Sequence, residues 1–266
     1  MPTIPLYQVD AFADRPFVGN PAEVCLLDHL RSDAWMQSLA AEMKHSETAF
    51  LLPDNDGYNL RWFTPGAEVD LCGHATLASA HILFATNRVE QNGEIRFSTR
   101  SGKLTARLND GWIELNFPVT LATPAPAPEG MLAALGISQP LYIGKNGYDY
   151  LIEVADESIV RNLKPDFRSL SAIPNRGVIV TARGSRDYDF MSRFFAPHIG
   201  VDEDPVTGSA HCTLTPYWSA KLGKIAFTAY QASERGGFLR VQLAGDRVFL
   251  AGQAVTIYEA KLNIQD

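Results

Sequence analysis

Cysteine is scarce in this sequence of 266 residues. Cys25, Cys72 and Cys212 are the whole complement, and an odd number of widely spaced cysteines does not form a disulfide framework. This usage is typical of proteins from a reducing compartment. The sequence therefore predicts a cytoplasmic protein.

Basic clusters and long apolar runs are also lacking. The formal net charge is -7, and no block of lysine and arginine is available to neutralise phosphates, which argues against a nucleic-acid partner. No stretch approaches the roughly twenty apolar residues that span a bilayer. The opening MPTIPLYQVD has neither the basic nor the apolar segment of a signal peptide. We expect a soluble protein with no membrane partner.

Apolar residues, by contrast, make up 46% of the chain, which is enough for one large core or two modest ones. Short apolar or β-branched runs bounded by Gly, Pro and Asn predict strands. They lie at 7–12, 23–27, 48–53, 58–63, 104–108, 112–117, 142–144, 149–154, 177–182, 193–197, 226–231, 238–243 and 247–258. The alternating Pro and Ala of residues 120–130 predict a stiff, unpacked connector. We therefore expect domains at 1–119 and 120–266, with the option that the last strand crosses back to the first domain.

Helices are few. Ser32 is the expected N-cap of a surface helix over 32–44, and a second short helix is expected at 158–163. Residues 75–85, ATLASAHILFA, are almost uncharged on all sides, which is typical of a buried helix. Another helix is expected from Gly208, where Pro216 either kinks it or ends a shorter first segment.

An internal repeat is the strongest feature of the sequence. Gly73 and Gly208 lie 135 positions apart, and the same offset relates a further set of identical residues. These pairs are Arg100 and Arg235, Gly102 and Gly237, Leu104 and Leu239, Leu108 and Leu243, and Leu115 and Leu250. We infer a duplicated unit and two similar domains, with a small-molecule site expected in the cleft between them.

The two repeated glycines lie where the two buried helices are expected to start. Gly73 and His74 fall in the first turn of one helix, and Gly208 of the other has hydroxyl neighbours in Thr207 and Ser209. Unpaired backbone N–H groups and the helix dipole favour negative charge at such a start. Two facing helix starts would therefore suit a carboxylate or an enolate.

Each candidate residue also has a purely structural interpretation. His74 alone is more often a packed or capping histidine, Glu47 a polar residue before a strand, and Asp204 part of a solvated acidic turn. Cys72 is typical of a small buried hydrophobic residue. A zinc site from Cys72, His74, His81, His211 and Cys212 is disfavoured because the paired spacings of structural zinc ligands are absent. We therefore predict no metal.

Four motifs, in order, resemble those of a known family. GNPAEV (19–24), SETAFL (46–51), FTPGAEVDLCGHAT (63–76) and DPVTGSAH (204–211) are similar to motifs of the PhzF family of phenazine-biosynthesis-type isomerases. The resemblance covers essentially the whole chain. It implies the α+β fold of diaminopimelate epimerase, in which two similar domains each curl an antiparallel sheet around a central helix and the active site lies between them.

The resemblance also implies roles for individual residues. Glu47 corresponds to the general acid/base that moves a proton between carbons of the substrate without a metal or organic cofactor. His74, Asp204 and Ser209 correspond to the other polar groups of the site. Substrate binding is expected at Gly73, Thr207 and Gly208, whereas Asn20 either contacts the substrate or fixes a turn. Family members are commonly homodimers, so we expect one here.

The chemistry expected of Glu47 depends on its surroundings. A carboxylate in an apolar cleft has a raised pKa, so we expect the pKa of Glu47 to be raised toward working pH. His74 and Asp204 are left as either substrate-binding groups or proton relays. The substrate, a small and cyclic amino or carboxylic acid on this reading, is not identified by the motifs.

Of three other functions, one is excluded by the sequence and two remain open. A racemase with two thiols needs cysteines at equivalent positions, but the equivalent of Cys72 is Thr207, whose hydroxyl does not ionise near neutral pH. An epimerase that uses Glu47 and another group is compatible with the sequence. So is a binding protein that retains the fold without activity, because function belongs to the site rather than to the fold.

Overall fold

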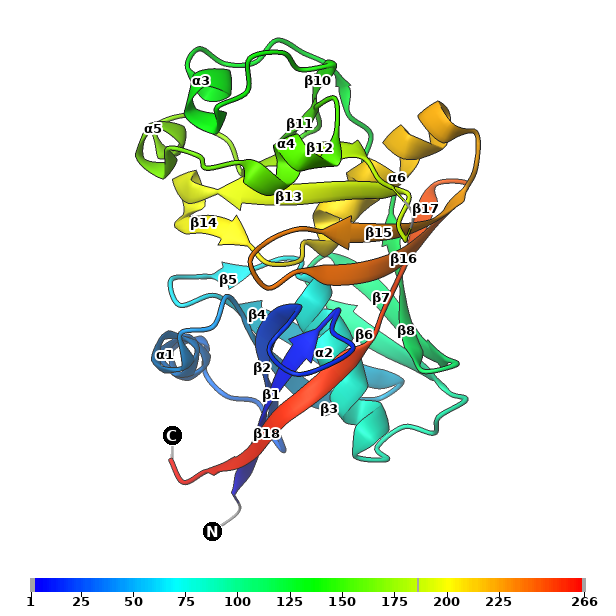
Figure 1. Cartoon of the computed structure of the whole chain (residues 1–266). Helices are drawn as coiled ribbons and strands as arrows, with labels where there is room; N and C mark the ends of the chain where they lie inside the picture. The colour runs from blue at the N-terminus through cyan, green and yellow to red at the C-terminus, as the bar shows by residue number, and fades with distance from the viewer. Residues whose placement is uncertain (1–2, 186, 265–266) are drawn as a thin grey trace. The chain divides into compact units, whose positions relative to one another are not determined.

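The computed structural model describes residues 3–185 and 187–264, and the chain divides into two compact units (Figure 1). Unit 1 comprises Met1–Asn116 and Ala251–Asp266, and unit 2 comprises Phe117–Leu250. The sequence predicts this division three residues later, after residue 119. The chain's last strand, β18 (Ala254–Leu262), pairs with the first, β1 (Ile4–Ala11), and thus belongs to unit 1.

Unit 1 is a mostly antiparallel sheet with two helices. After β1 come β2 (Asn20–Leu26), α1 (Asp33–Met43), β3 (Thr48–Asp54), β4 (Gly57–Phe63), β5 (Glu68–Val69), α2 (Gly73–Ala85), β6 (Glu94–Thr99), β7 (Gly102–Asn109) and β8 (Trp112–Pro118). The strands pair in the order β18, β1, β2, β3, β4, β6, β7, β8. The pairs β2–β3 and β4–β6 are parallel, so the sheet is not purely antiparallel.

Unit 2 has more helices at its start. Its elements are β9 (Thr123–Pro124), α3 (Met131–Leu135), β10 (Tyr142–Lys145), β11 (Asp149–Glu153), α4 (Glu157–Asn162), α5 (Phe167–Ser171), β12 (Gly177–Arg183), β13 (Phe190–Ala196), the 3-10 turn η1 (Pro197–Ile199), β14 (Val201–Asp204), α6 (Gly208–Leu222), β15 (Ala226–Gln231), β16 (Gly237–Ala244) and β17 (Arg247–Gly252).

The duplication expected from the sequence is confirmed in the strand pairing. In unit 1, β2–β3 and β4–β6 are parallel while β3–β4 and β6–β7 are antiparallel. In unit 2, β11–β12 and β13–β15 are parallel while β12–β13 and β15–β16 are antiparallel. The helices α2 and α6 begin 135 residues apart, and β7 and β16 share both ends at that offset.

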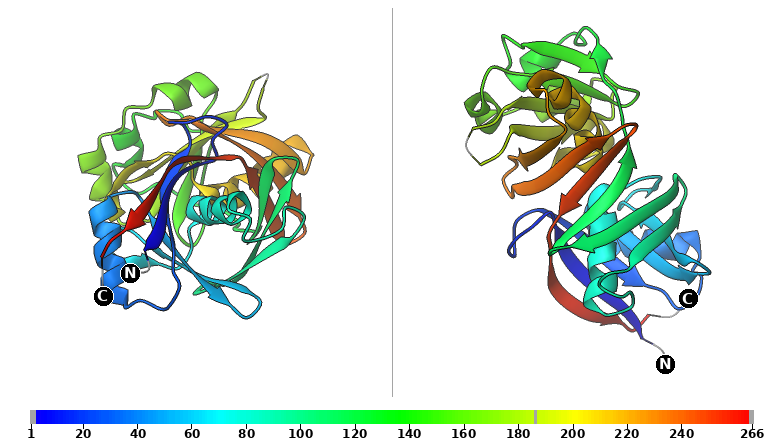
Figure 2. Two further views of the ribbon diagram at one scale, coloured as in Figure 1. Left: turned by 90° about the horizontal axis from the view of Figure 1, so that it is seen from below. Right: turned by 90° about the vertical axis from the view of Figure 1, so that its right-hand side faces the viewer.

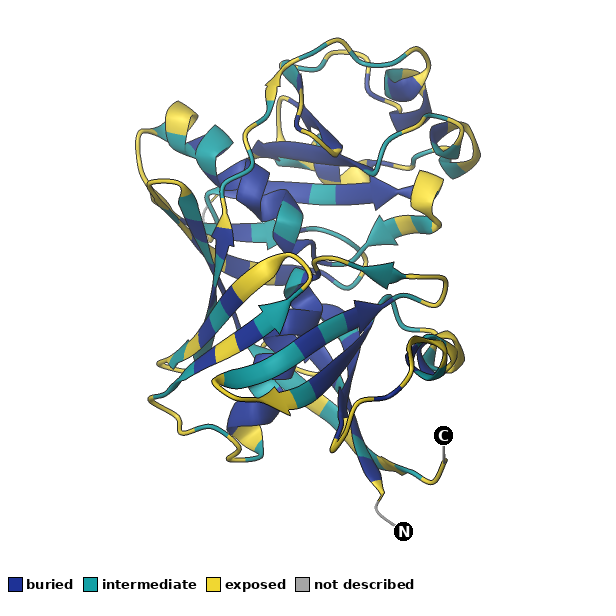
Figure 3. Ribbon diagram, turned by 180° about the vertical axis from the view of Figure 1, so that it is seen from behind, coloured by how far each residue is buried: buried dark blue, intermediate teal, exposed yellow. Residues whose placement is uncertain are grey.

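Helix α2 is the core of unit 1, where it packs on β1, β2, β3, β7 and β18 (Figures 2 and 3). Ala75, Leu77 and Ala78 are fully buried, as the uncharged sequence predicts. Its two buried hydroxyls need no outside partner, because Thr76 donates to the Cys72 carbonyl at 2.5 Å and Ser79 donates to the Ala75 carbonyl at 2.7 Å. Because many of its side chains are small and its buried hydroxyls are hydrogen-bonded within the helix, α2 can be enclosed by strands.

Helix α6 runs as one element through Pro216, so of the two predicted alternatives, a kink or a shorter first segment, the second is wrong. Proline has no N–H and leaves the carbonyl four residues earlier, that of Cys212, without its helical donor. The backbone N–H of Thr120 donates to this carbonyl at 3.2 Å. The compensating donor comes from a distant part of the chain, which explains why local sequence did not reveal it.

Residues 120–130 are exposed or half-buried, as expected of a connector, but hydrogen bonds tie them to unit 2. Thr123 and Pro124 form β9, which pairs with β10, and Val119 donates its N–H to the Asp246 carbonyl at 2.9 Å. The whole segment lies within unit 2. Of the described helices, none is long and apolar enough to cross a bilayer.

The predicted start of α1 is confirmed, since the Ser32 hydroxyl accepts the N–H of Trp35 at 3.2 Å. The helix ends at Lys44, which adopts the left-handed conformation with φ of 60°. Its N–H still donates to the Ala40 carbonyl. A residue with a Cβ pays a steric cost of about 1–2 kcal/mol in this conformation.

Replacing Lys44 with glycine should therefore stabilise the protein. Glycine removes the steric cost but loses more entropy on folding, so we expect the free energy of unfolding to rise by about 1 kcal/mol. Urea unfolding measures this change. Lys44→Ala is the matched control, because alanine keeps the Cβ and should give no such gain; an equal gain in both variants would contradict the explanation.

Candidate functional site

Glu47 lies in the short connection between α1 and β3. After Lys44 the chain runs alongside β2, and the Glu23 N–H of that strand donates to the Glu47 carbonyl at 3.2 Å. The pairing of Glu23 with Thr48 then starts the parallel β2–β3 ladder. The position of the Glu47 backbone is thus set by the beginning of a sheet, which is a rigid support.

His74 enters the same region from the first turn of α2. The N-cap of this helix is Cys72, which is extended and makes no side-chain capping bond. Without a side-chain cap, backbone N–H groups of the first turn keep their capacity to meet negative charge. Gly73 is the first residue of the helix, as predicted.

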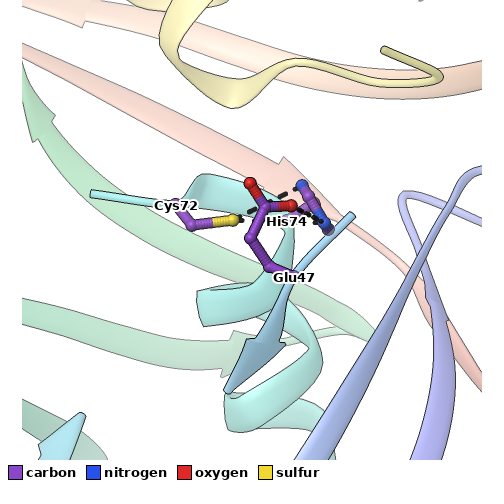
Figure 4. Close-up of side chains that lie close together, drawn as sticks. All are labelled: Glu47, Cys72 and His74. Atoms are coloured by element: carbon purple, nitrogen blue, oxygen red, sulfur yellow. Dashed lines mark hydrogen bonds and ion pairs between the residues drawn. The ribbon is translucent and has the colours of Figure 1, made fainter. Parts of the chain in front are cut away.

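The His74 ring is the centre of a buried group of side chains, which we call the unit 1 cluster: Asn20, Ser46, Glu47, Cys72 and His74. Its Nε2 lies 3.2 Å from Glu47 Oε2 and 3.2 Å from Ser46 Oγ. On the other side of the ring, Nδ1 lies 3.1 Å from Asn20 Nδ2 and 3.6 Å from Cys72 Sγ. Figure 4 shows the Glu47 carboxylate between the Cys72 sulfur and the His74 ring.

The charges of the cluster differ from the expectation that burial would raise the pKa of Glu47. Burial does act in that direction, but the positive charge of His74 and hydrogen bonds from His74, Ser46 and Cys72 outweigh it and lower the pKa. Burial alone would lower the pKa of His74, but its contacts with Cys72 and Glu47 raise it well above the ordinary value. The resting pair is therefore a carboxylate beside an imidazolium.

The remaining members of the cluster suit this state. Burial raises the pKa of Cys72 to about 11, which keeps its thiol protonated near neutral pH. The side chain of Glu47 is 18% exposed, but its Oε2 is closed to solvent and meets His74 as an ion pair rather than as a well-aligned hydrogen bond. The Asn20 amide can serve either state of His74, because a half-turn exchanges its donor for its acceptor.

Glu47, Cys72 and His74 also have ligand atoms within 4.8 Å of one another, a spacing that a metal ion could use. This set is not the one that the sequence suggested for zinc. A metal here would have to displace the protons of the thiol and of the imidazolium. The ion pair already balances the charge of the carboxylate, so the donors suit proton chemistry better, and the absence of a metal stays a prediction.

A second group of predicted residues lies in unit 2, and we call Arg176, Asp204, Thr207, Ser209 and Gln231 the unit 2 cluster. The Thr207 hydroxyl donates to Asp204 Oδ2 at 2.5 Å, and Gln231 Oε1 accepts the Thr207 N–H at 2.9 Å. Gln231 Nε2 donates to the Asp204 carbonyl at 2.7 Å. Asp204 and the start of α6 at Gly208 are thereby held together.

Arg176 holds the other predicted hydroxyl of unit 2. Its Nη2 donates to Ser209 Oγ at 3.3 Å, while its guanidinium forms an ion pair with buried Asp149, with Nε donating at 2.8 Å. Neither Arg176 nor Gln231 was predicted as a site residue from the sequence. Gln231 is the last residue of β15, and an isolated arginine 33 residues before Ser209 carries no local signal.

The structure brings the predicted residues together in two groups, one in each unit. Glu47, His74, Gly73 and Asn20 belong to unit 1, and Asp204, Thr207, Gly208 and Ser209 belong to unit 2. Ser46 and Cys72 were not assigned a role from sequence, although Ser46 precedes Glu47 in the SETAFL motif. That both groups act on one substrate stays a prediction.

Gly19 allows Asn20 to reach His74. Its φ is 70°, and a Cβ built there would lie 2.2 Å from the Ala11 carbonyl oxygen. Gly19→Ala should therefore lower the free energy of unfolding by roughly 2–3 kcal/mol, because both the dihedral and the backbone clash are unfavourable. Thermal or urea unfolding tests this. Gly66→Ala is the control, since nothing lies within 4 Å of its Cβ, and a similar loss there would refute the argument.

Comparison with known proteins decides the family. The family model for phenazine biosynthesis-like proteins, PhzC-PhzF, matches residues 9–260. The chain belongs to this family. It is 55% identical over 264 residues to a protein of Halalkalibacterium halodurans named an uncharacterized isomerase, covering 98% of this chain and 99% of that one. A protein of the same kind of name from Pseudomonas aeruginosa is 46% identical over 260 residues, covering 97% of this chain and 98% of that one.

A solved structure supports the same assignment. The crystal structure of a PhzF-family protein from Enterococcus faecalis is similar with a TM-score of 0.94 and 40% identity, covering 99% of this chain and all of that one. The expected α+β fold, with two similar units that each hold a central helix, is thus confirmed for this member of the phenazine biosynthesis-like family. Isomerase is the activity in the names of its relatives, and what it means for this chain is a proposal.

Proposed function

We propose that this protein is an isomerase that moves a proton between carbons of a small amino or carboxylic acid, with Glu47 as the general acid/base. The observation that carries the proposal is the contact of 3.2 Å between Glu47 Oε2 and His74 Nε2 at the start of α2. It supplies a carboxylate that is ionised, and so able to accept a proton, in an enclosed place.

The proposed step moves one proton and one electron pair. A substrate C–H bond next to a carbonyl or conjugated system breaks, its proton goes to a Glu47 oxygen, and its electron pair moves into the conjugated system. The proton then returns from Glu47 to another carbon. The imidazolium of His74 and the N–H groups at the start of α2 stabilise the negative charge that develops in between.

A carboxylate with a lowered pKa is a weak base. We propose that His74 raises the basicity of Glu47 during the reaction. Negative charge that develops on the substrate competes with Glu47 for the same imidazolium. As His74 turns its interaction toward the substrate, its hold on Glu47 weakens and the carboxylate becomes more basic. The ion pair therefore keeps Glu47 deprotonated at rest and releases it when the reaction begins.

We assign the polar groups of the substrate to unit 2 in this proposal. Asp204 is suited to an ammonium group because it is an acceptor fixed by Thr207. Ser209 and the first N–H groups of α6 are suited to a carboxylate. These assignments rest on chemistry within unit 2, and substitution of Asp204 or Ser209 should raise KM more than it lowers kcat.

Epimerisation is the second candidate, favoured by one specific observation. The Cys72 thiol lies within 4.8 Å of the Glu47 carboxylate and is protonated near neutral pH, so one cluster contains a proton acceptor and a proton donor. Inversion requires the proton to return to the opposite face of the carbon, so an epimerase could take the proton with Glu47 and return one from Cys72 only if the substrate carbon enters between the two groups and moves them apart. The products distinguish the two reactions, because epimerisation inverts one carbon whereas isomerisation moves hydrogen to another.

The experiment is hydrogen exchange in D2O, followed by proton NMR across a panel of cyclic amino acids and hydroxyanthranilate-like compounds. We expect deuterium to enter at carbon with at least one of them. Protein dialysed against EDTA should exchange at the same rate, since the proposed step requires no metal. If no compound gains deuterium, and none binds, the proposal fails in favour of another role for the fold.

A further inference from the structure

We propose that Glu23 and His45 form a clamp that positions Glu47, and thus that Glu23 is a positioning residue for proton transfer. This inference rests on the proposed function of Glu47. Glu23 is fully buried in β2, and its Oε1 lies 3.0 Å from Nε2 of His45. His45 stands two residues before Glu47 in the connection from α1 to β3.

Glu23 holds the segment 45–47 at two points. Its side chain holds His45, and its backbone N–H donates to the Glu47 carbonyl at 3.2 Å. The residue between them, Ser46, is held by the same strand, since its hydroxyl lies 3.5 Å from the Pro21 carbonyl. Every residue of the segment is thus tied to β2, and the side chain of Glu47 has little freedom to leave His74.

Residues on the two faces of β2 contact different parts of the site. Successive side chains of a strand point to opposite faces, so Asn20 and Glu23 face opposite sides of the sheet. Asn20 contacts the His74 ring, and Glu23 contacts His45. One strand therefore fixes both the imidazolium, through Asn20, and the segment that carries the carboxylate, through Glu23.

A purely stabilising role does not account for the Glu23 side chain. Burying a carboxylate is costly unless its oxygens are paired, and Oε2 has no hydrogen-bond partner among the described residues. Oε1, by contrast, meets both His45 and the hydroxyl of Tyr258, which donates at 2.7 Å. A charge kept in the core at this cost is typical of a residue retained for the geometry of a site.

Tyr258 provides a matched control, because it touches the same carboxylate oxygen from a different element. It lies on β18 opposite Gln8 of β1 and does not belong to the segment that carries Glu47. Tyr258→Phe removes one hydrogen bond to Glu23 and leaves the link to His45 intact. His45→Leu removes the link itself, and His45→Gln restores a donor near the position of Nε2.

The first measurement is kcat and KM for exchange in D2O. Misplacement of a catalytic group by about 1 Å can cost up to a hundredfold in rate, so we expect His45→Leu to lower kcat at least tenfold with KM within twofold. His45→Gln should recover at least half of the loss, and Tyr258→Phe should stay within twofold of the unchanged protein. Glu23→Gln combined with His45→Leu replaces the single variant if the unpaired carboxylate prevents folding.

The second measurement does not need turnover. The titration of the His74 ring, followed by NMR of 15N-labelled protein, reports its distance from the Glu47 charge, which raises the His74 pKa. His45→Leu should lower the His74 midpoint, and Tyr258→Phe should not. Equal effects of the two variants on either readout, or no effect of His45→Leu, overturn the clamp. If the unchanged protein exchanges no substrate, the proposed function fails, but the titration still decides the clamp.

Discussion

Glu47→Gln should lower the rate of hydrogen exchange at the substrate carbon by about 10²–10⁴-fold, the range of a lost general acid/base. Glutamine keeps the size of the side chain and a hydrogen-bond acceptor for His74, but it cannot take a proton from carbon. Substrate binding depends on other groups, so KM should change little. The measurement is deuterium incorporation at fixed substrate concentration, with the variant and the unchanged protein compared at the same pH.

The control for this variant is Glu42→Gln on α1. Glu42 undergoes the same change of charge five residues earlier, but its side chain is exposed. We expect the rate of Glu42→Gln to match that of the unchanged protein. If Glu47→Gln exchanged as fast as Glu42→Gln, Glu47 would not be the base.

Much of the fold follows from the sequence because the information is local or repeated. The uncharged run 75–85 could only be a buried helix, and α2 is enclosed by strands on several sides. The offset of 135 residues in the sequence is enough by itself to predict that α2 and α6 are equivalent helices. Ser32 marked the start of α1 because capping needs only a hydroxyl three residues before a free N–H.

The errors arise where a distant residue changes a local rule. Pro216 should interrupt a helix, but the Thr120 N–H satisfies the carbonyl that the proline leaves free. That contact joins Thr120 and Cys212, which lie 92 positions apart, and no sequence pattern near Pro216 predicts it. The same contact is one of those that tie residues 120–130 to unit 2, although none of these residues is buried.

For the candidate site, the sequence predicts which residues to consider but not the direction in which their pKa values shift. Glu47 and His74 could be chosen from their motifs, yet the direction of the Glu47 pKa depends on which group stands beside it. Apolar neighbours in the sequence AFLL suggested a raised pKa, whereas the nearest charge is His74, 27 positions away and 3.2 Å distant. Arg176 and Asp149 were missed for the same reason, because the contact of Arg176 with Ser209 and its ion pair with Asp149 exist only in space.

The ion pair of Glu47 and His74 makes stability depend on pH in a definite way. The lowered pKa of Glu47 contributes stability that is present above its unfolded value of about 4.3 and is lost as pH falls through the folded pKa. The raised pKa of His74 contributes stability that is complete below about 6.5 and is lost as pH rises through the folded pKa. Both contributions are complete between about pH 4.3 and 6.5.

His74→Leu should therefore cost most near pH 7, where His74 of the unchanged protein is still charged and Glu47 of the variant is ionised. Removing one partner of a buried pair then leaves a buried charge, and we expect a loss of about 3–5 kcal/mol near pH 7, with smaller losses at acid pH, where protonation neutralises Glu47, and above the His74 pKa. Burial of Glu47 is then unopposed, so its pKa rises above the ordinary value and the acid limb of the exchange rate moves to higher pH. Urea unfolding at a series of pH values from acid to alkaline, with exchange rates across the same series, measures both effects.

His81→Leu on the same helix separates this effect from the general loss of a histidine. Burial lowers the pKa of His81, whose Nε2 contacts the Thr256 hydroxyl rather than a carboxylate. A lowered histidine pKa destabilises the folded protein at acid pH, so relative to the unchanged protein His81→Leu should perform better as pH falls below about 6.5. The loss in His74→Leu should thus shrink as pH rises above neutral, whereas the effect of His81→Leu should be confined to pH below about 6.5. A loss in His74→Leu that stayed constant above neutral pH would mean that His74 is neutral in the folded protein and that Glu47 lacks the partner on which its ionisation depends.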